Sequence, residues 1–326
     1  MAEWLYEQGI GENRAILVED ETLILEAQIE LPGTLRAGAI VEGRLASIVI
    51  PGRRGLVETP AGPVLVEPLP PGPTEGAKVR VEISREAIAE PGNPKHARGR
   101  ITDETERSGP SLADRIGAFT SLQRTGPDRF EQAGWSELLE EALSGEIRFP
   151  GGALRMSVTP AMTLFDVDGG LPPAELAVAG AHAAGRAIRR LAIGGSIGID
   201  LPTLPAKADR QAAAAEFDDV LPQPFERTAV NGFGFLQVVR RRERESLPEL
   251  IRFDPIGAAA RALVRRAERV PGVGARLVAS APAVIARIES NPDWVAALAR
   301  STGAPIRLHG DQALTTWSGH VQCVPT

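Results

Sequence analysis

Three aspartates at the ends of two apolar runs could together hold a metal ion. The run "TLFDVDGG" (163–170) ends with Asp166 and Asp168, and the run "SIGIDLP" (196–202) carries Asp200. Side chains alternate along a strand, so Asp166 and Asp168 should point to the same face. Crowded carboxylates repel one another unless a cation lies between them, and oxygen ligands suit Mg²⁺, with Mn²⁺ as the alternative. Such an ion can polarise a phosphoryl oxygen and help to generate hydroxide. The competing interpretation is an ordinary turn, because aspartate before glycine is common where a strand ends.

The elements around these aspartates predict that two of them meet. A helix should occupy about 172–191, because proline favours the first helical turn and the glycines of "AIGGS" end the helix. With the two apolar runs as strands, residues 163–202 form a β–α–β unit, with parallel strands and a right-handed crossover. The carboxyl ends of parallel strands open at one edge of a sheet, where such folds bind ligands. Neighbouring strands lie about 4.8 Å apart, so Asp166 and Asp200 are predicted to share one ion.

Basic residues that could contact phosphate follow a glycine loop. The loop "VNGFG" contains Asn231, and the strand-like run after it ends in Arg240, Arg241 and Arg242. The segment 240–276 contains ten arginines and five acids, in a chain of net charge −6. Guanidinium groups suit paired hydrogen bonds to phosphate, so we expect the three arginines, and Asn231 in the loop, to contact phosphate. A solvated charged face is the alternative explanation of the same arginines.

The first third of the chain predicts a small β-barrel. Short β runs separated by Pro- and Gly-rich turns fill residues 38–100, which is typical of an OB-type barrel. Five cations in these runs could hold phosphates, namely Arg44, Arg53, Arg54, Lys78 and Arg80. No Phe, Tyr or Trp occurs between Glu7 and Ala118, so the barrel lacks the aromatic stacking that is worth about 1–3 kcal/mol per base. Its contact with a nucleic acid should be electrostatic, salt-sensitive and poor in sequence preference.

Four segments are predicted from these patterns. Residues 1–36 form a β-hairpin that packs on the aspartate-bearing part, and residues 37–101 form the barrel. Residues 102–150 form a shortened linker region, polar and aperiodic at its start, with one amphipathic helix at 135–144. Residues 151–326 form an α/β domain. Beyond its β–α–β unit we expect a helix at 207–221, and then helices at 258–269, 281–289 and 292–300 and strands at 275–280 and 304–309.

Composition excludes several classes of protein. The 326 residues are 43% hydrophobic and 24% charged, as in soluble globular proteins, and no apolar run approaches the length of a membrane span. The N-terminus lacks the pattern of a signal peptide. A single cysteine, Cys323, excludes a disulfide framework and a cysteine-based zinc site within one chain. We therefore expect a cytoplasmic protein without a membrane partner.

Three blocks of the sequence resemble a known family. "ALRMSVTPAMTLFDVDGG", "GGSIGIDLP" and "RTAVNGFGFLQVVRRRERESL" are similar, in order and spacing, to the catalytic region of the ribonuclease E/G family. The hairpin "RAILVEDETLILEAQIE" resembles the family's N-terminal segment, and "GAIVEGRLASIVIPGRRGLVE" resembles the start of its RNA-binding barrel. The tail at 257–308 resembles the α/β segment that ends the catalytic unit. The resemblance covers most of the chain, and the catalytic blocks are its specific part.

The resemblance implies a fold and an activity. It implies an α+β chain, α/β in its second half, with a small OB-type β-barrel joined to a deoxyribonuclease-I-like α/β catalytic domain. The family cleaves single-stranded RNA with Mg²⁺ held at the positions that match Asp166 and Asp200. This chain would therefore be a metal-dependent endoribonuclease of RNA processing and degradation, whose products carry a 5′-phosphate. Asp168 stands where the family has asparagine; it would support the ion or orient the attacking water.

Three departures from the family pattern limit what carries over. The cysteine pair that binds zinc between subunits is missing after "RESLPELI", so we expect no zinc and no zinc-linked oligomer. The region 102–150 is too short for most of the family's 5′-end sensor and ribonuclease-H-like subdomain. The second block keeps Asp200 but has Thr203 where the family has another acid. Two alternatives stay open: an RNA-binding protein of the same fold with attenuated cleavage, and a phosphodiesterase of short oligonucleotides.

Overall fold

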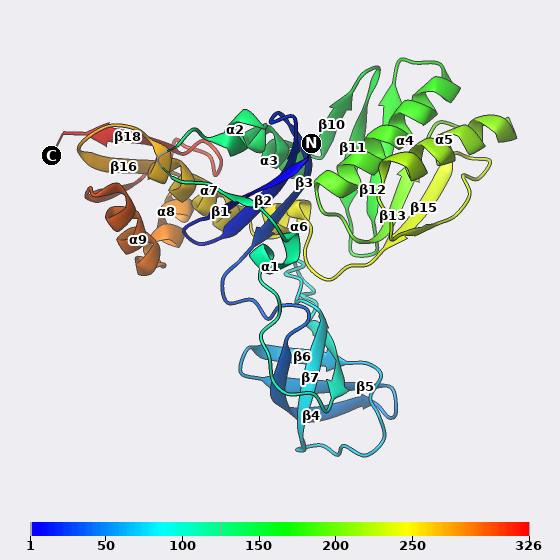
Figure 1. Cartoon of the computed structure of the whole chain (residues 1–326), viewed down its shortest axis with the longest axis horizontal. Coiled ribbons are helices and arrows are strands. Elements are labelled where there is room, and N and C mark those ends of the chain that lie inside the picture. The colour runs from blue at the N-terminus through cyan, green and yellow to red at the C-terminus, as the bar shows by residue number, and fades with distance from the viewer. Residues whose placement is uncertain (1, 125, 326) are drawn as a thin grey trace.

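The computed structural model describes residues 2–124 and 126–325. Met1 and Thr326, the outermost residues of the predicted end segments, and Thr125 of the predicted linker lie outside these ranges. The described chain has a mixed α+β fold with one closed barrel and three further sheets. In Figure 1 the barrel lies apart from the rest, and the N-terminal sheet lies between a larger sheet with two long helices and a small C-terminal lobe.

The aspartates lie on the six-stranded sheet, and the predicted β–α–β unit is confirmed. The sheet has the order β10-β11-β12-β13-β15-β14, and β12 and β13 are parallel. Its strands are β10 (Glu146–Phe149), β11 (Gly152–Val158), β12 (Thr163–Gly169), β13 (Gly195–Asp200), β14 (Glu226–Arg227) and β15 (Phe235–Arg240). The helices beside it are α4 (Pro173–Arg190) and α5 (Lys207–Val220). The sheet thus begins at residue 146, inside the segment predicted as a linker.

Helix α4 covers only one face of this sheet. A β-carbon added to Gly180 would lie 2.4 Å from Cγ1 of Val167, so glycine allows the helix to approach β12 closely. Phe165 is buried on the same face as Val167. Because side chains alternate along a strand, Asp166 and Asp168 point to the opposite face. That face, which we call the open face, carries the candidate site.

The predicted barrel is present as a closed five-stranded barrel with the order β4-β5-β6-β8-β7. Its strands are β4 (Ile40–Ile50), β5 (Arg54–Thr59), β6 (Gly62–Val66), β7 (Lys78–Arg85) and β8 (Ala97–Thr102). Its last strand, β8, ends at Thr102, one residue beyond the predicted barrel range 37–101. Ala97 and Gly99 face the barrel core while Arg98 and Arg100 face outward, so the outward arginines make the strand look polar in the sequence.

The N-terminal sheet contains the predicted hairpin. It has the order β3-β2-β1-β9, with β1 (Glu3–Gln8), β2 (Asn13–Glu19), β3 (Leu23–Glu30) and β9 (Thr120–Ser121). Four short helices surround it: α1 (Leu112–Ile116), α2 (Arg129–Gln132), α3 (Trp135–Ser144) and α6 (Leu247–Phe253). Leu5, Ile16 and Trp135 belong to the same hydrophobic core as Leu154 and Phe165 of the six-stranded sheet. One core therefore supports both sheets.

The C-terminal lobe has a core of its own. It consists of α7 (Pro255–Arg269), β16 (Ala275–Ser280), α8 (Pro282–Glu289), α9 (Pro292–Thr302), β17 (Ile306–Gly310) and β18 (His320–Val324). The strand order is β17-β16-β18. Its helices and first two strands confirm the predicted pattern, whereas β18 was not predicted. Val264, Val278 and Val284 are buried in a cluster separate from the main core, so the segment after residue 150 holds two sheets. No helix of the described ranges is long and apolar enough to cross a membrane.

A buried group of ion pairs joins this lobe to the N-terminal sheet. We call it the core charge cluster, and it consists of Glu7, Glu12, Arg14, Asp128, Glu131, Arg261, Arg265 and Arg269. Nε of Arg261 donates to Glu12 at 2.9 Å, and Nε of Arg265 donates to Glu7 at 2.9 Å. Burial would raise the pKa of Glu7, but Arg14, Arg265 and Arg269 together lower this pKa to about 2.

Candidate metal and nucleic-acid site

The strand register brings Asp166 and Asp200 side by side. Asp166 of β12 is the direct partner of Asp200 in β13, and the two strands are parallel. Paired residues of neighbouring strands lie about 4.8 Å apart along the hydrogen-bonding direction and share one face. Both aspartates are exposed. The predicted adjacency of Asp166 and Asp200 is therefore confirmed.

These aspartates belong to a row of four residues across the open face. Arg155 of β11 pairs with Asp166, and Phe235 of β15 pairs with Asp200. The order across the strands is thus Arg155, Asp166, Asp200 and Phe235, and we call these residues the acid row. A cation lies on one flank of the two carboxylates and an aromatic ring on the other. The row can hold a charged group at its centre and a flat apolar group at one side.

Asp168 forms an ion pair with Arg155. Its Oδ2 lies 3.1 Å from Nη2 of Arg155, and both side chains are more than half exposed. Within residues 2–124 and 126–325, no three His, Cys, Asp or Glu side chains form a group that could hold a metal ion. Arg155 therefore gives Asp168 a counter-charge. Sequence analysis missed Arg155, although alternation in "ALRMSV" places it in the polar phase of β11.

Asp166 and Asp200 remain as a pair that fits a divalent cation. Their side chains make no hydrogen bond or ion pair with any residue that the structure describes. Mg²⁺ in phosphoryl-transfer sites is commonly held by one or two carboxylates, several waters and the substrate's own phosphate oxygens. Two exposed, unpaired carboxylates on adjacent strands supply that donor set. Each carboxylate oxygen is also far better suited to Mg²⁺ or Mn²⁺ than to a soft metal.

Asn231 holds a turn beside the acid row. Its Oδ1 accepts hydrogen bonds from the backbone N–H groups of Phe233 (2.9 Å) and Phe235 (3.0 Å). Its own N–H donates to the carbonyl of Phe235 at 3.0 Å, and the N–H of Gly234 donates to the carbonyl of Asn231 at 3.1 Å. The carboxamide oxygen is therefore used within the loop, which weakens the expectation that Asn231 contacts RNA.

Phe233 is the exposed aromatic residue of this loop. Its side chain is 81% exposed, the largest value of any aromatic residue in the described chain. The backbone N–H of Leu201, directly after Asp200, donates to the carbonyl of Gly234 at 3.2 Å, so the loop lies against the end of β13. An aromatic residue between two glycines was the signal that sequence analysis could have used.

Arg240, Arg241 and Arg242 lie at the other end of the sheet. Arg240 pairs with Gly195, at the start of β13, whereas Asp200 ends that strand. Five residues of extended chain separate the two ends, which is about 17 Å. β15 runs away from the glycine loop, so these arginines could contact phosphate only at a distance from the two aspartates.

The three arginines also differ in availability. Arg240 donates to the carbonyl of Ile193, and burial lowers its pKa. Arg242 is paired with Glu249. Arg241 is 74% exposed and pairs with Glu243 at 2.9 Å. Only Arg241 presents most of its guanidinium to solvent, so it is the best placed of the three to contact a phosphate.

The barrel contacts the same end of the sheet as these arginines. Nζ of Lys95 donates to the carbonyl of Pro160, in the loop before β12, at 3.0 Å. The N–H of Glu86 donates to the carbonyl of Glu243 at 2.7 Å, and the N–H of Ala89 donates to Glu245 at 2.6 Å. The barrel is thus attached where β12 and β13 begin, one strand length from the acid row.

The predicted barrel cations form two groups. Arg53 and Arg54 surround Glu67 at 3.4 Å and 2.9 Å, and Arg98, which sequence analysis did not select, joins them at 2.7 Å. Three arginines around one carboxylate leave a net positive patch. Arg44 and Lys78 are direct strand partners, and Arg80 follows two positions along β7. Both groups leave cationic nitrogens for phosphate contact.

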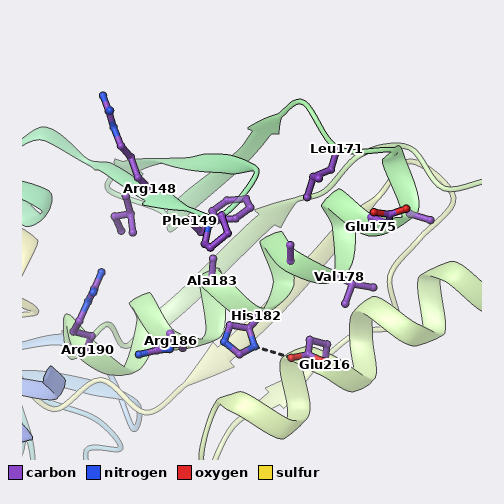
Figure 2. A pocket seen from close by; sticks show the side chains of 14 residues that line it. Arg148, Phe149, Leu171, Glu175, Val178, His182, Ala183, Arg186, Arg190 and Glu216 are labelled. Carbon is purple, nitrogen blue, oxygen red and sulfur yellow. Dashed lines mark hydrogen bonds and ion pairs between the residues drawn. The ribbon is translucent and has the colours of Figure 1, made fainter. Parts of the chain in front are cut away.

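A large cavity lies across the sheet from the acid row. It has a volume of about 860 Å³ and lies between β10 and α4, on the helical face. Figure 2 shows His182 of α4 pointing toward Glu216 of α5, and Nδ1 of the histidine lies 2.6 Å from Oε1 of the glutamate. Phe149 and Leu171 line the opposite wall. The sheet separates this cavity from Asp166 and Asp200, so it does not form part of the acid site.

A scan against protein-family models and a search of curated proteins find no match to the chain. The family resemblance seen in the sequence therefore stays a prediction.

Proposed function

We propose that this protein is a Mg²⁺-dependent endoribonuclease that cleaves single-stranded RNA and leaves 5′-phosphate products. The observation that carries the proposal is the parallel, in-register pairing of Asp166 with Asp200 on an open sheet face. Two adjacent, exposed and unpaired carboxylates repel each other, and this arrangement persists in enzymes where a cation and a phosphate use it. The resemblance of the three blocks to the ribonuclease E/G family supports the same reading.

Each residue of the acid row has a distinct task in this proposal. Asp166 and Asp200 hold the ion, which when bound supplies Lewis-acid polarisation of a phosphoryl oxygen and lowers the pKa of water. Arg155 neutralises Asp168 and still has guanidinium hydrogens that can donate to a non-bridging phosphate oxygen. Asp168, which pairs with Arg155, would accept a proton from the attacking water. The bond that breaks is P–O3′, so phosphate stays on the downstream product and a 3′-hydroxyl on the upstream one.

The barrel supports a single-stranded substrate. Its third strand pairs in parallel with its fifth and its first strand closes on its fourth, an order that supports an OB-type barrel. Such barrels bind extended nucleic-acid strands, with site sizes of about 4–16 nucleotides. The barrel and Arg241 lie at the start of β12 and β13, and the acid row lies at their ends. A strand held by the barrel could therefore run along the open face to the two aspartates.

The test is cleavage of a 5′-labelled single-stranded RNA in Mg²⁺. The native chain should cut the RNA and Asp200→Ala should not, while both bind it with similar salt dependence. Asp219→Ala is the matched control, because Asp219 is an exposed aspartate on α5, away from the open face. Products should carry 5′-phosphate, shown by labelling only after phosphatase treatment. Cleavage that survives Asp200→Ala would reject the proposal.

Two observations favour a second candidate, an RNA-binding protein with attenuated cleavage. The Arg155–Asp168 ion pair removes one carboxylate from the site, and the barrel has no aromatic residue for stacking. Gel shifts without cleavage by either native chain or Asp200→Ala would support this candidate. Cleavage limited to the shortest oligonucleotides would instead support a phosphodiesterase. A cytoplasmic location, as expected from the single cysteine, accords with each of these functions.

A further inference from the structure

We infer that Phe233 is the stacking platform for one nucleobase of the strand whose phosphate lies at Asp166 and Asp200. The inference rests on the proposed function and adds a base-binding position to it. Phe233 exposes 81% of its side chain, whereas Phe119, the next most exposed aromatic residue in the described chain, exposes 38% and packs on Tyr6. Exposing a phenylalanine forgoes favourable burial, and this residue stands beside the candidate active site.

The loop holds Phe233 in a defined position. Oδ1 of Asn231 accepts hydrogen bonds from the backbone N–H groups of Phe233 and Phe235. The N–H of Gly234 donates to the carbonyl of Asn231. The φ of Gly234 is +95°, and a β-carbon there would lie 2.2 Å from the carbonyl oxygen of Leu201. Glycine is therefore required at this contact. A ring presented by a fixed turn loses little conformational entropy when a base stacks on it.

The loop places this ring on the aromatic flank of the acid row. Phe235 pairs directly with Asp200, and Phe233 precedes it by two residues in the loop that touches Leu201. Arg155 lies on the other flank, next to Asp166. A phosphate at the two aspartates would thus have a cation on one side and an exposed ring on the other. This asymmetry suits a nucleotide, which has an anionic phosphate and a flat base.

Stacking at this position explains how the protein would select unpaired strands. A base inside a duplex is already stacked and cannot reach a ring at the sheet edge without leaving its neighbours. The barrel cannot supply stacking, because residues 8–117 contain no aromatic residue. Phe233 would therefore supply, next to the bond to be cut, a stacking contact that the barrel lacks.

The test combines protein variants with abasic nucleotides. Binding of a short single-stranded RNA is measured by fluorescence anisotropy in an Asp200→Asn background, with Phe233 intact or changed to Leu or Trp. Phe233→Leu should weaken binding about 5- to 150-fold, and Phe233→Trp should retain it. One abasic position should weaken binding to the Phe233 protein by a similar factor and have no further effect in Phe233→Leu. Val273→Ala, which changes an apolar residue that is 98% exposed in the C-terminal lobe, should leave binding unchanged.

The outcomes separate this inference from the proposed function. The native chain could cleave RNA while every abasic position weakens binding equally with Phe233 and with Phe233→Leu. The inference is then overturned, and the nuclease proposal stands. If coupling is present and the native chain does not cleave, Phe233 stacks on RNA and the nuclease proposal fails. Self-association that Phe233→Leu abolishes, without coupling to any base, overturns the inference in favour of a protein contact. Absence of RNA binding overturns it as well.

Discussion

The core charge cluster and the acid row both bring carboxylates together, but they balance the charges in opposite ways. In the cluster Glu7 contacts three arginines, Arg14, Arg265 and Arg269, and is almost fully buried. In the acid row Asp166 and Asp200 are exposed, and their side chains have no protein partner in the described ranges. Burial without pairing is costly, so the cluster must be balanced within the chain. The exposed pair can remain unbalanced, because water stabilises it until a ligand arrives.

The comparison shows which feature of an acidic group points to function. Clustering alone does not, since the cluster contains more charged residues than the row. What distinguishes the row is that two like charges lie at paired strand positions without a partner, although an arginine lies one strand away and pairs with Asp168 instead. The following changes test whether the cluster contributes stability and the row contributes activity, from the largest expected effect to the smallest.

Asp166→Asn and Asp200→Asn should each lower RNA cleavage by about 10³-fold or more, because each removes one of two ionic ligands of the cation. Single-turnover cleavage of labelled RNA measures this loss. Without Mg²⁺ each variant should unfold in urea at the same or a slightly higher concentration than the native chain, since a repulsion is relieved. A marked loss of stability in both variants would show that Asp166 and Asp200 stabilise the fold, as the core charge cluster does, and would contradict the comparison.

Glu7→Gln should lower the free energy of unfolding by about 3 kcal/mol near neutral pH, which corresponds to the depression of the Glu7 pKa from 4.5 to about 2. Because the folded pKa is depressed, this stabilisation is present above pH 4.5 and is lost as the pH falls toward 2. Urea denaturation of both proteins across this range should show the difference shrinking with acidification. Glu137→Gln, on the exposed side of α3, is the matched control and should change little. A constant difference at every pH would contradict the ion-pair origin.

Mg²⁺ at about ten times its dissociation constant should raise the free energy of unfolding of the native chain by about 1.4 kcal/mol, because it binds only the folded site. Thermal unfolding with and without Mg²⁺ measures this shift. The double variant Asp166→Asn, Asp200→Asn should show no specific increase. An equal increase in both proteins would indicate that the ion binds elsewhere.

Arg155→Ala should have the smallest effect on stability, within about 0.5 kcal/mol, because the ion pair with Asp168 is exposed and solvent screens it. Its informative effect is on the metal: the freed Asp168 adds negative charge beside Asp166, so half-maximal cleavage should require less Mg²⁺. RNA binding should weaken slightly through the loss of one cation. Arg148→Ala, an exposed arginine of β10, is the control. A higher Mg²⁺ requirement would show that Arg155 does not compete with the ion.

The β–α–β unit could be predicted because several independent signals agree there. Proline at 172–173, glycine at 194–195 and two apolar runs each limit the element boundaries, and parallel pairing follows from the helix between the strands. The meeting of Asp166 and Asp200 then needs only the register that pairs Asp166, near the end of β12, with Asp200, the last residue of β13. By contrast, β10 has four residues and β18 has five, and runs of this length carry too little periodicity to separate them from loops.

The remaining features depend on contacts between distant segments. Predicting the ion pair of Arg155 with Asp168 requires the register of β11 against β12. Predicting that Arg240 lies far from the aspartates requires the direction of β15. Hydrophobic alternation describes each strand by itself and does not state which strand lies beside it. Strand β8 is a further example. Its outward-facing arginines make the run look polar in the sequence, and only the closed barrel shows that Ala97 and Gly99 face the core.

The core charge cluster has a consequence for how the chain folds as it is made. Glu7 and Arg265 are separated by 258 positions. At about 5–20 residues per second, the ribosome delivers the second partner roughly 10–50 s after the first. Until then Glu7 and Glu12 have only Arg14 of the core charge cluster nearby in the sequence as a partner. The N-terminal sheet can therefore complete its docking only after helix α7 has been synthesised.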